Sequence, residues 1–408
     1  MRRISVRALM VSGAMIVACE NAGDAKASKA PGVAPPAPAV AHRDTVAGFT
    51  VPPQCAQGSI PVPRARALAH ATTPVTHADS VARATADSMH MSGSAARDTA
   101  VAQAAVPPAA PAPKSAKAAR ADSIARVRAK AHADSMRLIA LQTDSAATHR
   151  RPGSLLPGCR IVAYYGNPMS KRMGILGEIH PDSMLARLAK QAAAYQAVDP
   201  TRPVLPALEL IATVAQGAPG KSGLYRARMP DSLIERVMGW AEAHHYLVIL
   251  DIQTGRSTMA TELVPLMKYL ARPYVHLALD PEFSIGTKRV PGKVIGRIDA
   301  SDVNAVSGVL ANLVDSLQLP PKVLIVHRFT TPMLSNHEKI KLDPRVQIVI
   351  DMDGFGPPRL KYGSYKAYVH DRPVQFAGFK VFYKNDKPML TPAQVLELDP
   401  VPLFVMYQ

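Results

Sequence analysis

Residues 274–283 read YVHLALDPEF, an apolar run that ends in two carboxylates, Asp280 and Glu282. Pro281 separates the two acids, and because proline cannot donate a ladder hydrogen bond, we expect the strand to stop there. Alternation along a strand predicts a shared face for four side chains: His276, Ala278, Asp280 and Glu282. Acids at the end of a buried strand are costly unless something uses them. The pair therefore indicates either a functional site or a structural pair that caps the next turn or binds an arginine.

Besides this stretch, seven further apolar runs have the length and composition of buried strands. The eight predicted strands span residues 160–165, 204–214, 247–253, 274–280, 322–329, 346–351, 374–383 and 402–407. Apolar residues recur at helical spacing between most of them. The predicted helices span residues 183–198, 231–244, 261–270, 301–317, 332–340 and 391–398.

Eight strands alternating with helices over residues 154–408 predict an α/β fold, the (β/α)₈ or TIM barrel, which typically needs ~250 residues. The helix-to-strand links are short and the strand-to-helix links are long, as at 215–230, 283–300 and 354–372. Asp182 or Ser183, Asp231 and Ser301 are candidate N-caps of three helices. The alternative, a doubly wound open sheet, would need a phosphate-binding glycine turn after the first strand, where the chain instead reads YYGNP.

The first 19 residues have the pattern of an export signal, with three arginines followed by a short apolar segment that is too short to span a bilayer. The segment ends IVAC and resembles the lipobox of bacterial lipoproteins, which implies lipidation at Cys19. Residues 20–153 are rich in Ala, Pro, Ser and Thr, a composition typical of a disordered tether. We therefore expect an exported protein held by Cys19 at the outer membrane or cell surface.

The net charge of +17 is spread along the chain rather than concentrated on one element. Residues 20–151 hold 16 Lys and Arg against 9 Asp and Glu, and residues 152–408 hold 29 against 22. No arginine-rich helix with interleaved aromatics is present, which argues against a nucleic-acid partner. The predicted partners are the membrane, through Cys19, and a glycan, and no cofactor or metal is predicted.

Besides Cys19, the chain has two cysteines, Cys55 and Cys159. In an exported protein they could pair with each other, remain free thiols or form an intermolecular bridge. Neither stands in a C-x-x-C motif, so their spacing gives no indication of a metal site.

If the barrel is correct, the carboxyl ends of its strands meet at one face, where barrels keep their sites. Acids, aromatic residues and one His-Arg pair occur at these strand ends. The expected ring consists of Tyr164, Tyr165, Asn167, Glu209, Asp251, Gln253, Asp280, Glu282, His327, Arg328, Asp351, Asp353, Tyr383, Lys384 and Tyr407.

Carboxylates together with aromatic platforms suit a carbohydrate, because aromatic faces stack on sugar rings and polar side chains bind hydroxyls. Glycoside hydrolysis needs one carboxyl group as the acid and a second carboxylate opposite it. Glu282 is the predicted acid, since the charge of Asp280 would raise its pKa. Asp251, Asp351 or Asp353 would supply the second carboxylate. The predicted substrate-binding residues are Tyr165, Glu209, Gln253, His327, Arg328, Asp353, Tyr383 and Tyr407.

Residues 160–408 resemble the TIM-barrel glycoside hydrolase superfamily through three acidic strand ends, 250–253, 280–282 and 351–353. The D-x-E of the fourth strand is similar to that of chitinase-like and wall-lysozyme-like families. Leu277 and Leu279 stand where the fuller chitinase pattern has acids, and the first strand lacks the acid of the lysozyme-type barrel. The chain also resembles exported bacterial proteins that share the Tyr-Tyr-Gly and Leu-Asp-Pro-Glu-Phe stretches. The resemblance implies a glycosidase acting on a wall or extracellular glycan.

Three other interpretations remain open. A catalytically silent barrel could bind a glycan or a protein at the cell surface. A metal-dependent hydrolase would use His276, His327, Asp251 and Asp280. Two basic segments, 286–297 and 361–366, are either solvated loops or binding sites for an anionic polymer.

Overall fold

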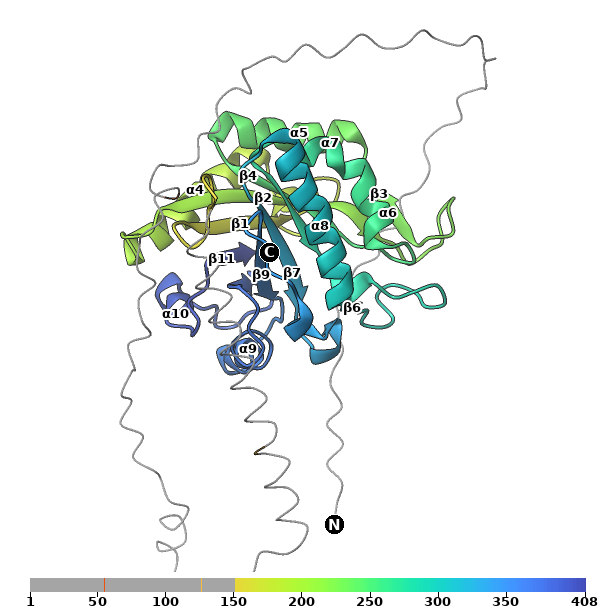
Figure 1. The fold of residues 1–408 in the computed structure, drawn as a ribbon. Coiled ribbons are helices and arrows are strands. Elements are labelled where there is room, and N and C mark those ends of the chain that lie inside the picture. The colour runs from red at the N-terminus through yellow and green to blue at the C-terminus, as the bar shows by residue number, and fades with distance from the viewer. Residues whose placement is uncertain (1–54, 56–125, 127–150) are drawn as a thin grey trace, which may run out of the picture. The chain divides into compact units, whose positions relative to one another are not determined.

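Eight parallel strands form the centre of the protein in a computed structural model that describes Cys55, Arg126 and residues 151–408 (Figure 1). The sheet closes because β1 pairs with both β2 and β11. The sequence therefore predicts the TIM barrel correctly, and every predicted strand is present. The strands are β1 (Arg160–Gly166), β2 (Val204–Ala215), β4 (Leu247–Ile252), β5 (Val275–Leu279), β7 (Lys322–Arg328), β9 (Val346–Met352), β10 (Phe376–Val381) and β11 (Phe404–Tyr407).

The proposed lipidation site and nearly all of the expected tether lie outside the described residues. Among the residues that the structure does describe, no helix combines the length and the apolar character of a membrane span.

Amphipathic helices bury one face against the strands, as the helical spacing predicts. Leu310 and Val314 on one face of α8 are fully buried, whereas Val309 and Leu317 are exposed. The helices are α3 (Ile175–Glu178), α4 (Pro181–Val198), α5 (Asp231–His244), α6 (Met259–Leu263), α7 (Met267–Leu270), α8 (Ala300–Leu317), α9 (Pro358–Tyr365) and α10 (Pro392–Leu396).

The predicted N-caps are wrong by one to three residues. The observed N-caps are His180 for α4, Pro230 for α5 and Asp299 for α8. Asp299 forms a capping box, because its side chain accepts the Ser301 N–H while Asp302 accepts the Asp299 N–H.

Three predicted segments between the strands differ from the structure. The expected helix at 332–340 is replaced by two 3₁₀ turns, Thr331–Met333 and His337–Lys339, on either side of β8 (Leu334–Ser335), which pairs with β6 (Ile298–Asp299). The expected long loop at 354–372 instead contains α9 and a π-helical turn. The predicted helix 261–270 is divided into α6, a 3₁₀ turn and α7.

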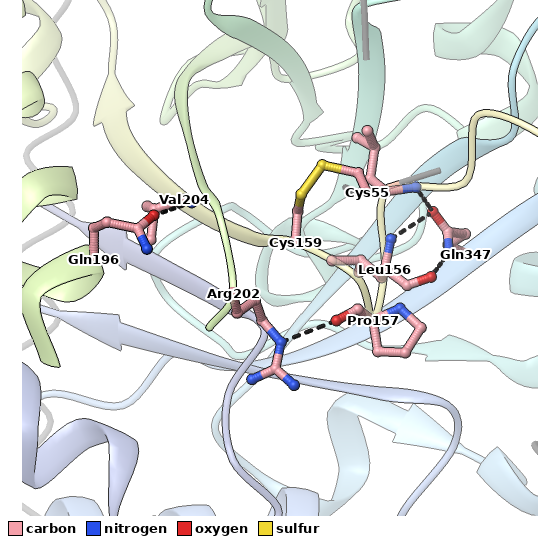
Figure 2. Close-up of a disulfide and its surroundings, with 9 residues drawn as sticks. Cys55, Leu156, Pro157, Cys159, Gln196, Arg202, Val204 and Gln347 are labelled. Carbon is pink, nitrogen blue, oxygen red and sulfur yellow. Dashed lines mark hydrogen bonds between the residues drawn. A yellow bond between two sulfur atoms is a disulfide. The ribbon is translucent and has the colours of Figure 1, made fainter. Parts of the chain in front are cut away.

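A disulfide between Cys55 and Cys159 lies at the amino ends of the strands (Figure 2), so of the three open states of these cysteines the structure has the intramolecular bridge. Gln347 at the start of β9 accepts the Leu155 N–H, and its amide donates to the Leu156 carbonyl at 2.6 Å. The segment that precedes β1 is thereby held against this end of the barrel.

Candidate active site

Polar side chains fill the barrel at the carboxyl ends of the strands. They come from every barrel strand except β11, or from the residues that directly follow the strand. Nine of the predicted residues and one unpredicted lysine form this interior cluster, which consists of Tyr165, Glu209, Asp251, Gln253, Asp280, Glu282, His327, Asp351, Asp353 and Lys380.

The deepest part of the interior cluster is a histidine between two acids. His327 Nε2 lies 3.0 Å from Glu209 Oε1, and His327 Nδ1 lies 3.1 Å from Asp351 Oδ2. All three side chains are fully buried. Burial alone would disfavour the imidazolium, but the hydrogen bonds with Asp351 and Glu209 outweigh it and raise the pKa of His327 well above its ordinary value. His327 therefore supplies one positive charge to this layer.

A second layer lies closer to the mouth of the barrel and is centred on Gln253. Its amide nitrogen lies 3.1 Å from Asp280 Oδ2 and 3.2 Å from the Tyr165 hydroxyl. The Tyr165 hydroxyl in turn donates to Asp251 Oδ2 at 3.2 Å. A continuous hydrogen-bonded chain thus joins the ends of β1, β4 and β5.

One member of the interior cluster, Lys380, is absent from the residues predicted from the sequence. Its ammonium lies 3.0 Å from Asp353 Oδ1 and 3.9 Å from the centre of the Tyr165 ring. A lysine inside the apolar strand β10 is an available signal, because burial of a cation requires a partner. Two positions before it, Gly378 leaves space for Asp351, since a Cβ there would lie 2.7 Å from Asp351 Oδ1.

Glu282 does not continue the strand alternation from which its position was predicted. β5 ends at Leu279, and Glu282 lies in a 3₁₀ turn, Pro281–Phe283. Asp280 caps this turn by accepting the Glu282 N–H at 3.3 Å. Asp280 is buried and Glu282 is half-buried, so the turn lifts Glu282 toward the opening of the barrel.

The interior cluster holds more negative than positive groups. Six carboxyl groups face only two cations, His327 and Lys380. Oxygens of three of these acids lack a hydrogen-bond partner among the described residues: Glu209 Oε2, Asp251 Oδ1 and Asp351 Oδ1. Full ionisation of all six acids would leave several buried charges uncompensated, which is costly.

Protonation of some acids relieves this excess. Burial, together with the charges of Asp280 and Asp353, raises the pKa of Glu282 to about 8. Burial also raises the pKa of Asp280 to about 6, with a further contribution from Asp353. The pKa of Asp251 is raised well above its ordinary value by burial and by the charge of Asp280. Glu282 is therefore largely a neutral acid at pH 7, and it can donate a proton.

The predicted aromatic residues Tyr164, Tyr383 and Tyr407 lie outside the interior cluster. The Tyr164 and Tyr383 hydroxyls are 2.8 Å apart, and the Tyr407 hydroxyl lies 2.8 Å from that of Tyr195 on α4. They form a separate tyrosine cluster against α4, with their rings edge-on or tilted to one another. The structure thus does not bring Tyr383 and Tyr407 together with the carboxylates.

Four other candidates have local structural partners. Arg328 donates to backbone carbonyls, including that of Leu334 at 3.3 Å. The remaining three are spread over different elements. Asn167 donates to the Ile211 carbonyl, Lys384 pairs with Glu178, and His276 accepts the Val323 N–H at the amino end of β7.

Glu209, Asp251 and His327 could hold a metal ion in place of the proton on His327 Nε2, because one ligand atom from each lies within 4.8 Å of the others. Asp351 on the other ring nitrogen of His327 would act as the outer carboxylate that commonly orients a ligating histidine. This set differs from the predicted one, since His276 is at the opposite end of the strands. The donor types suit a divalent cation of oxygen and nitrogen preference.

No family model matches the chain, and a search of curated proteins finds no similar sequence.

Proposed function

We propose that this protein is a glycoside hydrolase with Glu282 as its general acid. The observation that carries the proposal is the position of Glu282, half-buried at the carboxyl face of a TIM barrel with a pKa raised to about 8. Sites of TIM-barrel enzymes lie at this face. A glycosidase acid must keep its proton at the working pH until it protonates the leaving oxygen.

Asp353 is the proposed second carboxylate. It is one of the two acids whose charge acts on Glu282, and its side chain pairs with Lys380 at 3.0 Å. The Asp251 and Asp351 side chains are fully buried, whereas 8% of the Asp353 side chain is exposed, so Asp353 is the best placed of the three to reach a sugar. Asp280 is assigned the role of keeping Glu282 protonated, and Gln253 and Tyr165 that of binding hydroxyl groups.

The proposed setting is the cell envelope, with the chain exported and held by a lipid on Cys19. The arginine-containing first segment and the IVAC sequence support this setting. The substrate would then be a wall or extracellular glycan within reach of the anchored barrel.

The test compares the wild type with Glu282→Gln on peptidoglycan and on soluble polysaccharides, with release of reducing ends as the measurement. Loss of the general acid should lower the rate by roughly 10²- to 10⁴-fold. Glu338→Gln is the matched control, because Glu338 is exposed and lies outside the interior cluster. Equal rates for wild type and Glu282→Gln would remove Glu282 from this role, and binding without cleavage by the wild type would favour a silent glycan-binding barrel.

A further inference from the structure

We propose that the glycan bound by this protein is anionic and that it lies on a cationic rim beside Glu282. This inference rests on the proposed function, because it names the substrate class of the same site. The cationic rim comes from the loops that follow β2, β4 and β5. It consists of Lys221, Arg256, Lys288, Arg289, Lys293 and Arg297.

The three loops of the cationic rim are joined to one another by backbone contacts. The Arg256 N–H donates to the Leu224 carbonyl at 2.8 Å, and the Ile285 N–H donates to the Gly255 carbonyl at 3.3 Å. Gly255 has φ +59°, and a Cβ there would lie 2.3 Å from the Tyr225 carbonyl oxygen, so only glycine fits. The cationic rim is thus a surface of fixed geometry, since each loop holds the next in position.

Side-chain contacts reinforce this arrangement. The Arg256 guanidinium stacks on the Tyr225 ring at 3.9 Å and donates from Nε to the Arg289 carbonyl at 2.7 Å. Tyr225 has a positive φ of 52°, which a bulky residue adopts only where its surroundings require it. Arg256 therefore connects all three loops while remaining partly exposed.

The cationic rim has no acidic counterpart. Residues 215–230, 253–258 and 283–298 contain no Asp or Glu. Arg226 and Arg228, the other two cations of these loops, pair with Glu262 on α6. Among residues 151–408, no ion pair involves a rim side chain, although other exposed cations such as Lys268 and Lys366 are paired. Six unpaired charges of one sign attract anions to this surface.

The rim directly adjoins the proposed acid. The Gly296 N–H donates to the Glu282 carbonyl at 2.6 Å, and the Arg297 N–H donates to the Ser284 carbonyl at 3.0 Å. A Cβ on Gly296 would lie 2.7 Å from the Glu282 carbonyl oxygen, so the basic loop packs against the backbone of the acid itself. On the other side, Arg256 follows Gln253 by three residues.

A hollow of about 340 Å³ is lined by residues 284–289, Gly296 and Arg297, all from the loop after β5. Lys288, Arg289 and Arg297 in its wall can bind carboxylate, sulfate or phosphate groups, the arginines in a bidentate manner. The interior cluster is itself rich in acids, so it would repel an anionic chain. The cationic rim offsets that repulsion and lets a charged glycan place a glycosidic bond at Glu282.

The experiment measures binding separately from cleavage, using the full chain with Glu282→Gln as the starting protein. The rim variant adds Lys288→Gln, Arg289→Gln and Lys293→Gln, all at exposed positions. The matched control adds Lys339→Gln, Lys341→Gln and Arg359→Gln, which removes the same charge from exposed positions outside the rim. The probes are polygalacturonate, heparin, neutral dextran and a DNA duplex, each in 50 and 300 mM salt.

We expect the starting protein to bind polygalacturonate or heparin more tightly than dextran and DNA, and high salt to weaken this binding. The rim variant should lose roughly tenfold in affinity, because it removes charges at the binding site. The control, which removes the same charge elsewhere, should change affinity by less than about twofold. Binding to only one of the two polymers identifies carboxylate or sulfate as the recognised group. Equal losses in both variants, equal binding of dextran, or tighter binding of DNA would overturn the inference.

The two proposals fail in different ways. If the cationic rim is wrong, Glu282 can still cleave a neutral glycan, and the rim variant made in the wild-type background keeps that rate. If the hydrolase is wrong, rim-dependent binding remains while no polysaccharide is cleaved.

Discussion

The two ends of the barrel treat buried charge differently. At the amino end, Lys322 donates to the Arg272 and Val275 carbonyls at 2.6 and 3.0 Å, and Arg160 pairs with Asp199 at 3.0 Å. The atoms without a partner among the described residues of this end are two nitrogens, Arg160 Nη1 and His276 Nε2. At the carboxyl end, six acids face two cations. The amino end thus meets its buried cations with backbone carbonyls and one aspartate. The carboxyl end is left with an excess of acids, and that excess is the candidate for chemistry.

The largest expected difference between the ends concerns their histidines. His327→Ala removes the cation between Glu209 and Asp351, which should cost about 3–5 kcal/mol because two buried carboxylates lose their partner. His276→Ala at the amino end loses one hydrogen bond, to the Val323 N–H at 3.1 Å, and should cost about 1–3 kcal/mol. Urea unfolding of both variants at pH 7 measures the two losses. A smaller loss for His327 than for His276 would contradict this difference between the two ends.

The disulfide should affect stability and leave the carboxyl end unchanged. Cys55 and Cys159 are separated by 104 residues, so removing their bridge frees a long loop in the unfolded chain. The double variant Cys55→Ser with Cys159→Ser should lose about 2–4 kcal/mol. Glycan binding at low temperature should match that of the wild type. A change in affinity with the fold intact would show that the two ends are coupled.

The smallest expected effect is a difference in pH dependence. Asp280 and Glu282 have pKa values raised to about 6 and about 8, so their contribution to stability is present at acidic pH and is lost as the pH rises toward 8. Burial lowers the pKa of Lys322 from 10.5 to about 7, so its contribution is present at alkaline pH and is lost as the pH falls from about 10.5 to 7. The two ends therefore shift stability in opposite directions.

Two variants separate these contributions, with urea unfolding between pH 5 and pH 10 as the measurement. Relative to Glu282→Gln, the wild type should lose stability from pH 5 to 8, by at most about 1.4 kcal/mol per pH unit. Relative to Lys322→Met, it should gain stability from pH 7 to 10. A flat difference in either comparison would contradict the corresponding pKa shift.

The fold could be predicted because buried parallel strands are nearly continuous apolar runs, and all eight stand out in the sequence. The connections were harder to predict. The helix expected at 332–340 is broken into 3₁₀ turns around β8, which needs a partner in β6 some 36 positions earlier. Such a pairing leaves no local periodicity. Helix α9 was missed for a different reason, because it has little apolar periodicity of its own. Its Lys361 is buried, and it pairs there with Asp386 at 3.0 Å.

The candidate site was partly predictable for the same reason. Acids at strand ends must converge once the strands close into a barrel, so Asp251, Asp280 and Asp351 follow from the topology. Whether a side chain near a strand end faces the interior depends on its place in the alternation and on where the strand stops. Tyr407 is the last residue of β11 and Tyr383 follows β10 by two positions, and both lie against α4 instead. Lys380 was missed because it stands within a strand rather than at its end.

A direct titration of Glu282 tests whether this residue is protonated at neutral pH, as a general acid must be. The carboxylate infrared signal of the wild type minus that of Glu282→Gln isolates this one group as the pH is raised. The proposed general acid requires a midpoint near pH 8, where burial and the charges of Asp280 and Asp353 place it. A midpoint near the ordinary value of 4.5 would mean that Glu282 is ionised at neutral pH and cannot serve as the proton donor.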